Sequence, residues 1–280
     1  SIAWMSKATT LQQLPLGMIS VAISLAALPR LSQQFASGDV EAYRATLARG
    51  LRMVVVMIVP ILVGLGVLAE PAVRLLFERG QFTAGDSAQV VTALNVYLVG
   101  ALFAAVDFPL IYAFYARNDT LLPALVGVLS VLVYAAIALA LVEGLGYLGL
   151  VWADTGKQAA HALVMLALLY WKMGQIQRRQ GSERASELQE GWSAAGASPT
   201  VRTVISVAGA AGAMFVVMTA LLPRFGAGGS PSIVNDLVQL FVGGGSGMLV
   251  YAGLLLLVKQ PEARQLYGVV RRVSGLAKGI

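Results

Sequence analysis

Long apolar segments follow one another along almost the whole of this 280-residue chain. A helix needs about 20 mostly apolar residues to cross the hydrocarbon core of a bilayer, where every backbone amide must find a partner within the protein. Because 58% of the residues are hydrophobic and only 12% are charged, the chain has too little polar surface for a water-soluble globule. The sequence therefore predicts an all-α polytopic membrane protein with about seven transmembrane helices. The seven segments lie at roughly 9–29, 51–69, 90–115, 121–142, 147–172, 203–222 and 237–258.

Polar stretches divide these spans into four parts. Five spans fall in residues 1–172 and two more in residues 203–258. Residues 173–202 are rich in Ser, Glu, Gln and Arg with little apolar periodicity, which predicts a cytoplasmic polar linker. Residues 259–280 place apolar side chains at helical spacing among basic ones, which is typical of an amphipathic helix on an anionic inner leaflet. Within the loop 70–87 we also expect a short helix at the outer membrane interface.

Basic residues are unevenly divided between the two ends of the spans. Of the 20 Lys and Arg residues, fifteen lie in the connections after spans one, three and five and in the tail, whereas three lie in the opposite loops. Cytoplasmic loops carry the excess of Lys and Arg, so the pattern places the tail in the cytoplasm and the N-terminus outside. The same rule accounts for the net charge of +6. We therefore expect membrane lipids as partners and no nucleic acid.

Several kinds of chemistry are disfavoured by what the chain contains. It has no cysteine and a single histidine, which excludes a disulfide framework, a thiolate metal site and a multi-histidine zinc site. Gly144, Gly146 and Gly149 spell a dinucleotide-binding pattern, but a span precedes them where a short strand is required, so we read a tight outer turn. The sequence also shows no serine, histidine and acidic residue placed on adjacent elements as the nucleophile, base and orienting acid of a catalytic triad. We expect neither an enzyme nor a cofactor.

The fifth span is the least apolar. Asp154, Lys157 and His161 follow at i, i+3 and i+7, which puts them on one stripe of a helix. A charge near the centre of a transmembrane helix costs roughly 2.5 to 3.5 kcal/mol on insertion scales, so these side chains must face protein or water. They form either the wall of a polar cavity or a pair that neutralises itself between helices. Asp107 in span three could line the same cavity or pair with Lys157.

Six segments of the chain stand out as motifs. They are WMSKATTLQQLPLG at 4–17, LPRLSQQFASGD at 28–39, LARGLRM at 47–53, RLLFERGQFTAGD at 74–86, FYARNDTLLP at 114–123 and GLGYLGL at 144–150. In order and spacing, across almost all of the chain, they resemble the MurJ/MviN family, the lipid II flippases of the MOP superfamily. RLLFERGQFTAGD is the most specific of the six.

The resemblance implies a place in a larger fold and a substrate. The seven spans would be the eighth to fourteenth helices of a fourteen-helix protein, whose N-terminal lobe would be a partner of this part. Ser1 lies close to a span without an initiating Met, which also favours a fragment. The family moves an undecaprenyl-pyrophosphate-linked glycan across the bacterial plasma membrane by alternating access between two lobes. We therefore expect a lipid-linked glycan as the substrate.

The chain departs from the family pattern at two places. Thr9 and Thr10 stand where the family commonly has an Asp-Arg pair, and its sodium-site residues fall on Ala135 and Leu139. An anionic pyrophosphate favours fixed cations. We therefore expect the positive charge of the lost arginine to be supplied by Lys7, or by Lys157 together with His161. Lys7 could instead extend its ammonium to the outer membrane interface.

The predicted substrate cavity thus comprises six residues. Two alternatives to a lipid II flippase remain open. In the first, a protein of the same fold exports another lipid-linked oligosaccharide or amphiphile. In the second, the protein is a transport-inactive scaffold for cell-envelope assembly, which would keep its function if the polar stripe were made apolar but would lose it if the linker or the tail were removed. The candidate cavity residues are Asp154, Lys157, His161, Asp107, Lys7 and Thr10.

Overall fold

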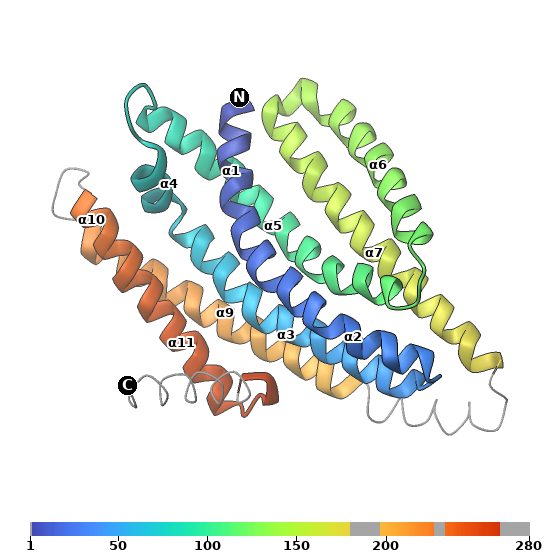
Figure 1. Cartoon of the computed structure of the whole chain (residues 1–280). Coiled ribbons are helices and arrows are strands. Elements are labelled where there is room, and N and C mark those ends of the chain that lie inside the picture. Colours follow the sequence, from blue (N-terminus) through green and yellow to red (C-terminus); the bar gives the residue numbers. More distant parts are fainter. Residues whose placement is uncertain (1, 180–196, 227–232, 264–280) are drawn as a thin grey trace, which may run out of the picture.

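The computed structural model describes residues 2–179, 197–226 and 233–263 of the chain (Figure 1). Every element within these ranges is a helix, so the all-α prediction is confirmed for the described residues. In chain order the elements are α1 (Ile2–Pro15), the π-helical turn η1 (Leu16–Val21), α2 (Ala22–Ala36), α3 (Val40–Val67), α4 (Ala69–Phe77), α5 (Ala84–Tyr115), α6 (Leu121–Leu145), α7 (Tyr147–Arg179), α9 (Ala197–Gly226), α10 (Ile233–Val238), the π-helical turn η2 (Gln239–Gly243) and α11 (Gly244–Leu257).

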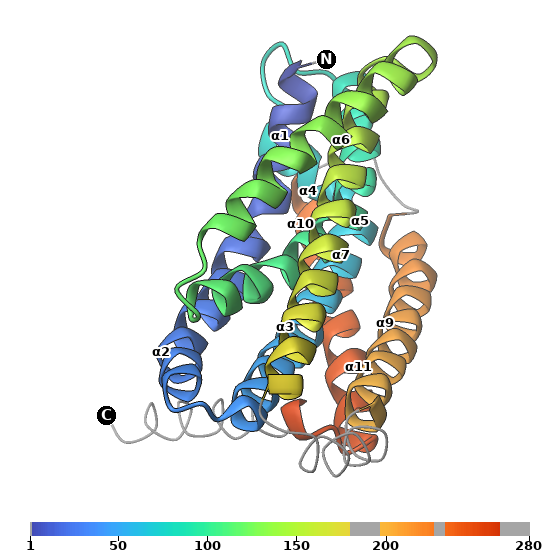
Figure 2. The ribbon, with the colours of Figure 1, turned by 90° about the vertical axis from the view of Figure 1, so that its right-hand side faces the viewer.

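Six of the described helices are long and apolar enough to cross a membrane, against seven predicted spans. The first is the continuous rod of α1, η1 and α2. The helix α7 is not in this set although it has 33 residues, because its middle carries the polar stripe. It runs antiparallel to α6 and beside it, so it passes through the same depth of the bundle as a helix that qualifies (Figures 1 and 2). The six ranges are Ile2–Ala36, Val40–Val67, Ala84–Tyr115, Leu121–Leu145, Pro199–Pro223 and Ile233–Leu257.

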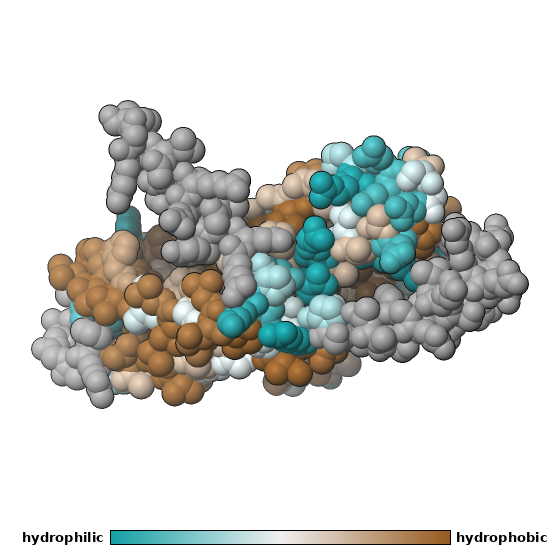
Figure 3. All heavy atoms as spheres, turned by 90° about the horizontal axis from the view of Figure 1, so that it is seen from below, coloured by the Kyte–Doolittle hydropathy of each residue, from teal (hydrophilic) through white to brown (hydrophobic). Residues whose placement is uncertain are grey.

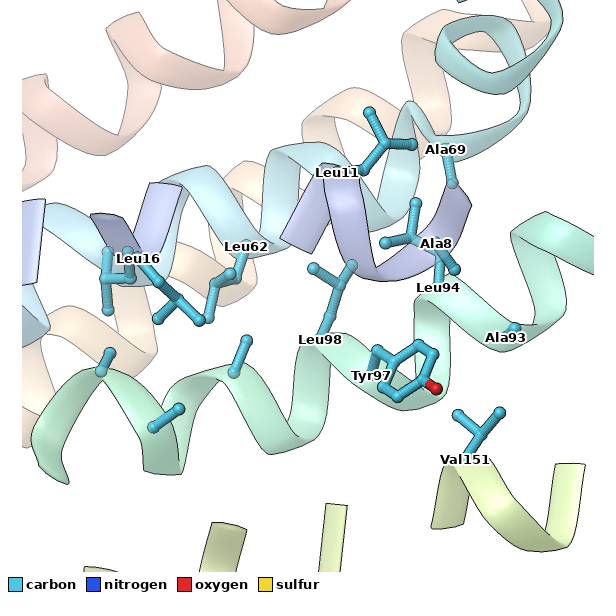
Figure 4. Packing of buried hydrophobic residues seen from close by; sticks show 14 of the residues in the cluster. Ala8, Leu11, Leu16, Leu62, Ala69, Ala93, Leu94, Tyr97, Leu98 and Val151 are labelled. Carbon is cyan, nitrogen blue, oxygen red and sulfur yellow. The ribbon is translucent and has the colours of Figure 1, made fainter. Parts of the chain in front are cut away.

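The helix α5 lies at the centre of the first part of the bundle and packs against α1, α3 and α7. Its buried residues include Leu94 and Leu98, which meet Leu11 and Leu16 of the first rod in one apolar cluster (Figure 4). Such a cluster requires small or aliphatic side chains on one stripe of each helix, and interiors packed in this way have little room to rearrange. The core therefore fixes the faces that α1 and α7 turn toward α5.

The helices α9 and α11 form a pair that packs against the opposite side of α3 (Figures 1 and 2). The Tyr251 hydroxyl donates to the Val56 carbonyl oxygen at 2.8 Å, which joins the middle of α11 to α3. Two ion pairs fix the ends: Arg52 Nε lies 2.6 Å from Glu262 Oε1, and Arg74 of α4 lies 2.8 Å from Asp236 of α10. Because these contacts join residues far apart in sequence, they hold the part of the chain from α9 to the end of α11 against the helices before it.

A tight turn joins α6 to α7, as the glycine pattern predicts. Gly146 ends α6 with a φ of 56°, a left-handed conformation that glycine adopts without strain. Three residues on, a Cβ added to Gly149 would lie 2.7 Å from the carbonyl carbon of Leu141. Glycine at this position therefore permits the two helices to approach each other closely.

The other ends of this hairpin are joined by charge. The Lys172 ammonium of α7 donates to the Asp119 carboxylate in the connection between α5 and α6. Partial burial would raise the pKa of the Asp119 carboxyl, but the hydrogen bonds from Lys172 and from the Leu122 amide hold the pKa below its ordinary value. The contact therefore stabilises the hairpin when the carboxyl is ionised.

Side-chain caps mark where two of the helices begin. Asp39 accepts a hydrogen bond from the Ala42 amide at the start of α3. Thr83 and Asp86 form a reciprocal capping box at the start of α5, and Trp4 of α1 donates to the same aspartate at 2.9 Å. The predicted short helix in the preceding loop is present as α4. One end of the bundle is therefore held by hydrogen bonds between separate helices.

Both ends of the predicted linker are helical where the structure describes them. The helix α7 continues to Arg179, beyond the predicted end of the fifth span, and α9 begins at Ala197, before the predicted start of the sixth. The central part of the linker, 180–196, and the amphipathic tail helix predicted in 264–280 lie outside the described residues. Seen from the end of the bundle at which α7 ends and α9 begins, hydrophilic residues gather from the middle toward one side, and hydrophobic residues cover most of the other side (Figure 3).

Candidate functional site

A partly open cavity of about 750 Å³ lies between the first rod, α5, α6 and α7. Aliphatic and aromatic residues from all four helices form part of its wall. The rest is polar, and this is unusual for a wall made of membrane-spanning helices, because a polar group facing lipid is costly. The polar lining residues are Thr9, Gln12, Gln13, Tyr97, Asp107, Tyr134, Asp154, Lys157 and Gln158.

Two residues of the predicted stripe pair with each other and also line this cavity. Lys157 Nζ lies 2.6 Å from Asp154 Oδ1, one helical turn away on α7. Their side chains are 28% and 24% exposed, and the ammonium lies 5.9 Å from the centre of the Tyr134 ring across the cavity wall on α6. The two readings from sequence, a cavity wall and a self-neutralising pair, therefore both describe this stripe. The lysine is not a free cation.

The third residue of the stripe pairs across helices. His161 Nδ1 lies 2.7 Å from Oδ2 of Asp107 on α5, and both side chains are about nine-tenths buried. This contact is an ion pair when the ring carries a proton, and Nδ1 has no hydrogen-bond partner among the described residues. Asp107 also lines the cavity. Its partner is therefore the histidine and not Lys157, which was one of the pairings that the sequence left open.

A close approach of α5 and α7 explains how these side chains come together. The Thr155 hydroxyl of α7 donates to the Val96 carbonyl oxygen of α5 at 3.1 Å. Opposite it, a Cβ on Gly100 would lie only 3.0 Å from Thr155. Because Thr155 directly follows Asp154, this contact sets the rotation of α7 and turns its polar stripe toward the cavity.

Lys7 and Thr10 are not among the described residues that line the cavity. The Lys7 ammonium lies 4.4 Å above the centre of the Phe77 ring and 5.3 Å from that of Phe82, beside α4. Such cation–π contacts stabilise a lysine outside water. The Thr10 hydroxyl is exposed and donates back to the Ser6 carbonyl oxygen of its own helix. Three of the six predicted residues, Asp107, Asp154 and Lys157, therefore line the cavity. His161 is not in the lining and joins this group through its contact with Asp107, whereas Lys7 and Thr10 lie apart.

Other lining residues were not predicted as site residues. Gln12 is 4% exposed and lines the cavity. Tyr97 and Tyr134 lie in spans without periodic polar residues, so no pattern distinguished them from core aromatics. Ala135 and Leu139, where the resemblance predicts that the family's sodium-site residues would fall, are exposed on α6.

The charges lining the cavity nearly balance. Two carboxylates and one ammonium leave one formal negative charge, so this wall alone does not attract an anion. Among the described residues no group of three or more His, Asp or Glu side chains could hold a metal ion. A helical bundle with a polar, partly charged cavity at the depth of its apolar helices has the architecture of a multi-pass membrane transport protein.

Comparisons with known proteins give the family. A family model described as "Lipid II flippase MurJ" matches residues 1–230. The chain belongs to this family. It is 32% identical over 170 residues to a "Probable lipid II flippase MurJ" of Vibrio cholerae, covering 61% of this chain and 32% of that protein. It is likewise 32% identical over 165 residues to the protein of that name in Rhizobium meliloti, covering 59% and 31%.

A solved structure supports the fold independently. The "Lipid II flippase MurJ, inward closed conformation" superposes with a TM-score of 0.69 at 18% identity, covering 95% of this chain and 48% of that chain. The present chain therefore spans about a third of the length of the curated relatives that it matches and about half of that structure. The fold of the described bundle corresponds to one part of a flippase.

Proposed function

We propose that the chain is the C-terminal lobe of a flippase that moves a lipid-linked peptidoglycan precursor, lipid II, across the bacterial plasma membrane. The movement would occur by alternating access, in which the cavity opens first to one side of the membrane and then to the other. The chain would bind and carry the substrate without a chemical step.

One observation carries the proposal. The cavity brings Asp107, Asp154 and Lys157 together at the depth of the membrane-spanning helices. Burying charged side chains there costs free energy, and a bundle with a purely structural role could avoid this cost by having apolar residues at these positions. A headgroup that is both polar and anionic gives these residues a role, since it must cross the apolar layer inside a polar compartment.

The charge balance of the cavity bears on the second lobe. A wall with one formal negative charge cannot hold a pyrophosphate without added cations. We propose that these come from the facing N-terminal lobe of a longer chain, across the open side of the cavity. The distribution of Lys and Arg favours an N-terminus outside the cell and a C-terminus in the cytoplasm.

The experiment compares two lysines of one helix. Lys157→Ala and Lys172→Ala are each introduced into the full-length protein, and translocation of lipid II is measured in cells depleted of their own flippase. Both residues pair with an aspartate, but only Lys157 lines the cavity. We expect translocation to fall at least about tenfold in the first variant, the equivalent of about 1.4 kcal/mol, and to stay near wild type in the second. Equal activity of the two variants at matched expression would refute the proposal.

The shortage of cations favours one alternative, a cargo with less negative charge than a pyrophosphate. Under that alternative the same protein would move another lipid-linked oligosaccharide, and lipid II would fail to compete with it. A transport-inactive scaffold would behave differently again. It would keep its envelope phenotype in Lys157→Ala and lose it when residues 174–200 are deleted.

A further inference from the structure

The Asp107–His161 pair is the most deeply buried charged contact around the cavity. His161 is the single histidine of the chain, and it lies on α7 one turn beyond the Asp154–Lys157 pair. The two side chains are 10% and 11% exposed. Imidazole is the side chain whose charge ordinarily changes between about pH 5 and pH 8. This histidine contacts an aspartate that lines the cavity, so a proton bound to its ring would add a positive charge beside the cavity wall.

Both members of the pair keep unused hydrogen-bonding capacity. Asp107 Oδ1 and His161 Nδ1 are buried and have no hydrogen-bond partner among the described residues. Buried polar atoms without partners are rare and costly, and each such atom in a native structure calls for a reason. Proton binding is such a reason here. The Asp107 carboxylate lies 2.7 Å from the imidazole of His161, so it would stabilise a proton bound to the ring.

The surrounding groups leave this pair as the element that can change charge. On α7, Asp154 and Lys157 neutralise each other. The other ionisable groups lining the cavity are the phenols of Tyr97 on α5 and Tyr134 on α6. Phenols in general lose their proton only well above neutral pH. The first rod contributes only neutral threonine and glutamine side chains to the polar lining, and the Lys7 ammonium on that rod lies against aromatic rings of α4 and the following loop.

We propose that Asp107 of the cavity wall and His161, which contacts it from α7, form a proton-binding site, and that binding of the anionic headgroup and binding of this proton favour each other. This rests on the proposed function, which supplies the anionic headgroup. With a neutral ring, the four side chains of the two pairs carry one formal negative charge. One proton from water, taken up on the ring to give an imidazolium, brings the sum to zero and lowers the repulsion of an anion.

The linkage is reciprocal. If protonation raises the affinity for the headgroup by a given factor, headgroup binding raises proton affinity by the same factor, and typical couplings are about 5- to 150-fold. The first experiment measures the Kd of lipid II for the full-length protein in nanodiscs between about pH 5 and pH 8. As the pH rises from about 5 to about 8, we expect the Kd of lipid II for the wild-type protein to increase at least about fivefold. In His161→Gln, whose side chain stays neutral, we expect the pH dependence to disappear.

A matched control separates this pair from other carboxylates. Asp119→Asn removes an aspartate that is also ion-paired but lies outside the cavity lining, so its pH dependence should equal that of wild type. A wild-type affinity that ignores pH, or a His161→Gln variant that keeps the wild-type dependence, would overturn the proposal. An affinity that follows sodium concentration and not pH would also overturn it, in favour of a metal cation.

A second measurement does not depend on the cargo. The full-length protein is labelled with ¹⁵N-histidine, and the signal of His161 is assigned by its loss in His161→Gln. We expect this signal to change with pH, and the pH range of the change to be displaced in Asp107→Asn but not in Asp119→Asn. Identical titration in wild type and Asp107→Asn would overturn the pairing. Failure of lipid II to bind at any pH, with the displacement present, would instead count against the proposed function alone.

Discussion

Removal of the Arg52 charge should destabilise the bundle far more than removal of its partner. Arg52 of α3 contacts Glu262 after α11 with 2.6 Å between Nε and Oε1, and its Nη1 also donates to Thr200. The glutamate side chain is 3% exposed and its second oxygen has no hydrogen-bond partner among the described residues, whereas the arginine side chain is 17% exposed. The perturbation is Arg52→Gln, compared with Glu262→Gln.

The two magnitudes follow from what each change leaves behind. Arg52→Gln leaves a buried carboxylate without its cation, and breaking a buried pair in this way costs about 3 to 5 kcal/mol. Glu262→Gln leaves an arginine that reaches water and can still hydrogen-bond to the amide oxygen, so we expect a loss of about 1 kcal/mol. The predicted difference between the two variants is therefore at least about 2 kcal/mol.

The assay is the free energy of unfolding in mixed detergent micelles, measured for wild type and both variants. Arg49→Gln, an exposed arginine about one turn earlier on α3, is the matched control and should change the free energy by less than about 0.5 kcal/mol. The reasoning would be refuted if Arg52→Gln matched Arg49→Gln, or if Glu262→Gln proved the more costly of the pair. The first result would mean that the ion pair adds nothing to docking of α11 on α3.

Three further variants test the packing of single elements by thermal unfolding. Gly149→Val should cost about 1 to 3 kcal/mol, because its side chain would collide with the α6 backbone, whereas Gly144→Val meets no neighbouring atom within 4 Å and should cost less; equal effects would contradict the close approach. The lowered pKa of Asp119 means that its contact with Lys172 stabilises the protein above pH 3.8 and is lost as pH falls through the lower folded-state value, so Asp119→Asn should be destabilising at neutral pH and nearly neutral in acid; a penalty that persists in acid would contradict this. Tyr251→Phe removes the hydroxyl that donates to a main-chain carbonyl of α3 and should cost about 0.5 to 1.5 kcal/mol; an unchanged midpoint would show that the hydrogen bond contributes nothing.

Local patterns predicted much of the fold. Apolar segments of spanning length gave the helices, glycines gave the turn between α6 and α7, and the loop before α5 was correctly predicted to hold a short helix. Helix ends were less predictable. The helix α7 continues past Lys172 to Arg179, because a polar sequence at the end of a span can continue a helix into water without losing a backbone hydrogen bond.

Part of the candidate site could also be predicted from local patterns, and part could not. The spacing of Asp154, Lys157 and His161 placed them on one stripe, since helical periodicity is a property of a single segment. Which neighbour each would meet was not predictable. Asp107 lies 54 positions before His161, and its pairing depends on how α5 and α7 rotate against each other. Lys7 is not among the described residues that line the cavity, and its contact with an aromatic ring of α4 depends on how α4 packs beside α1, which sequence does not show.

The amino-acid sequence is enough to predict that this chain crosses a membrane many times and that one helix carries ionisable residues on a single face. These follow from hydropathy and from a period of 3.6 residues, which act over a turn or a span of one segment. The tertiary structure alone decided that this face borders a cavity and that its histidine meets an aspartate of another helix. Those facts depend on close contacts such as that of Thr155 with Gly100, and the packing of helices distant in sequence sets them.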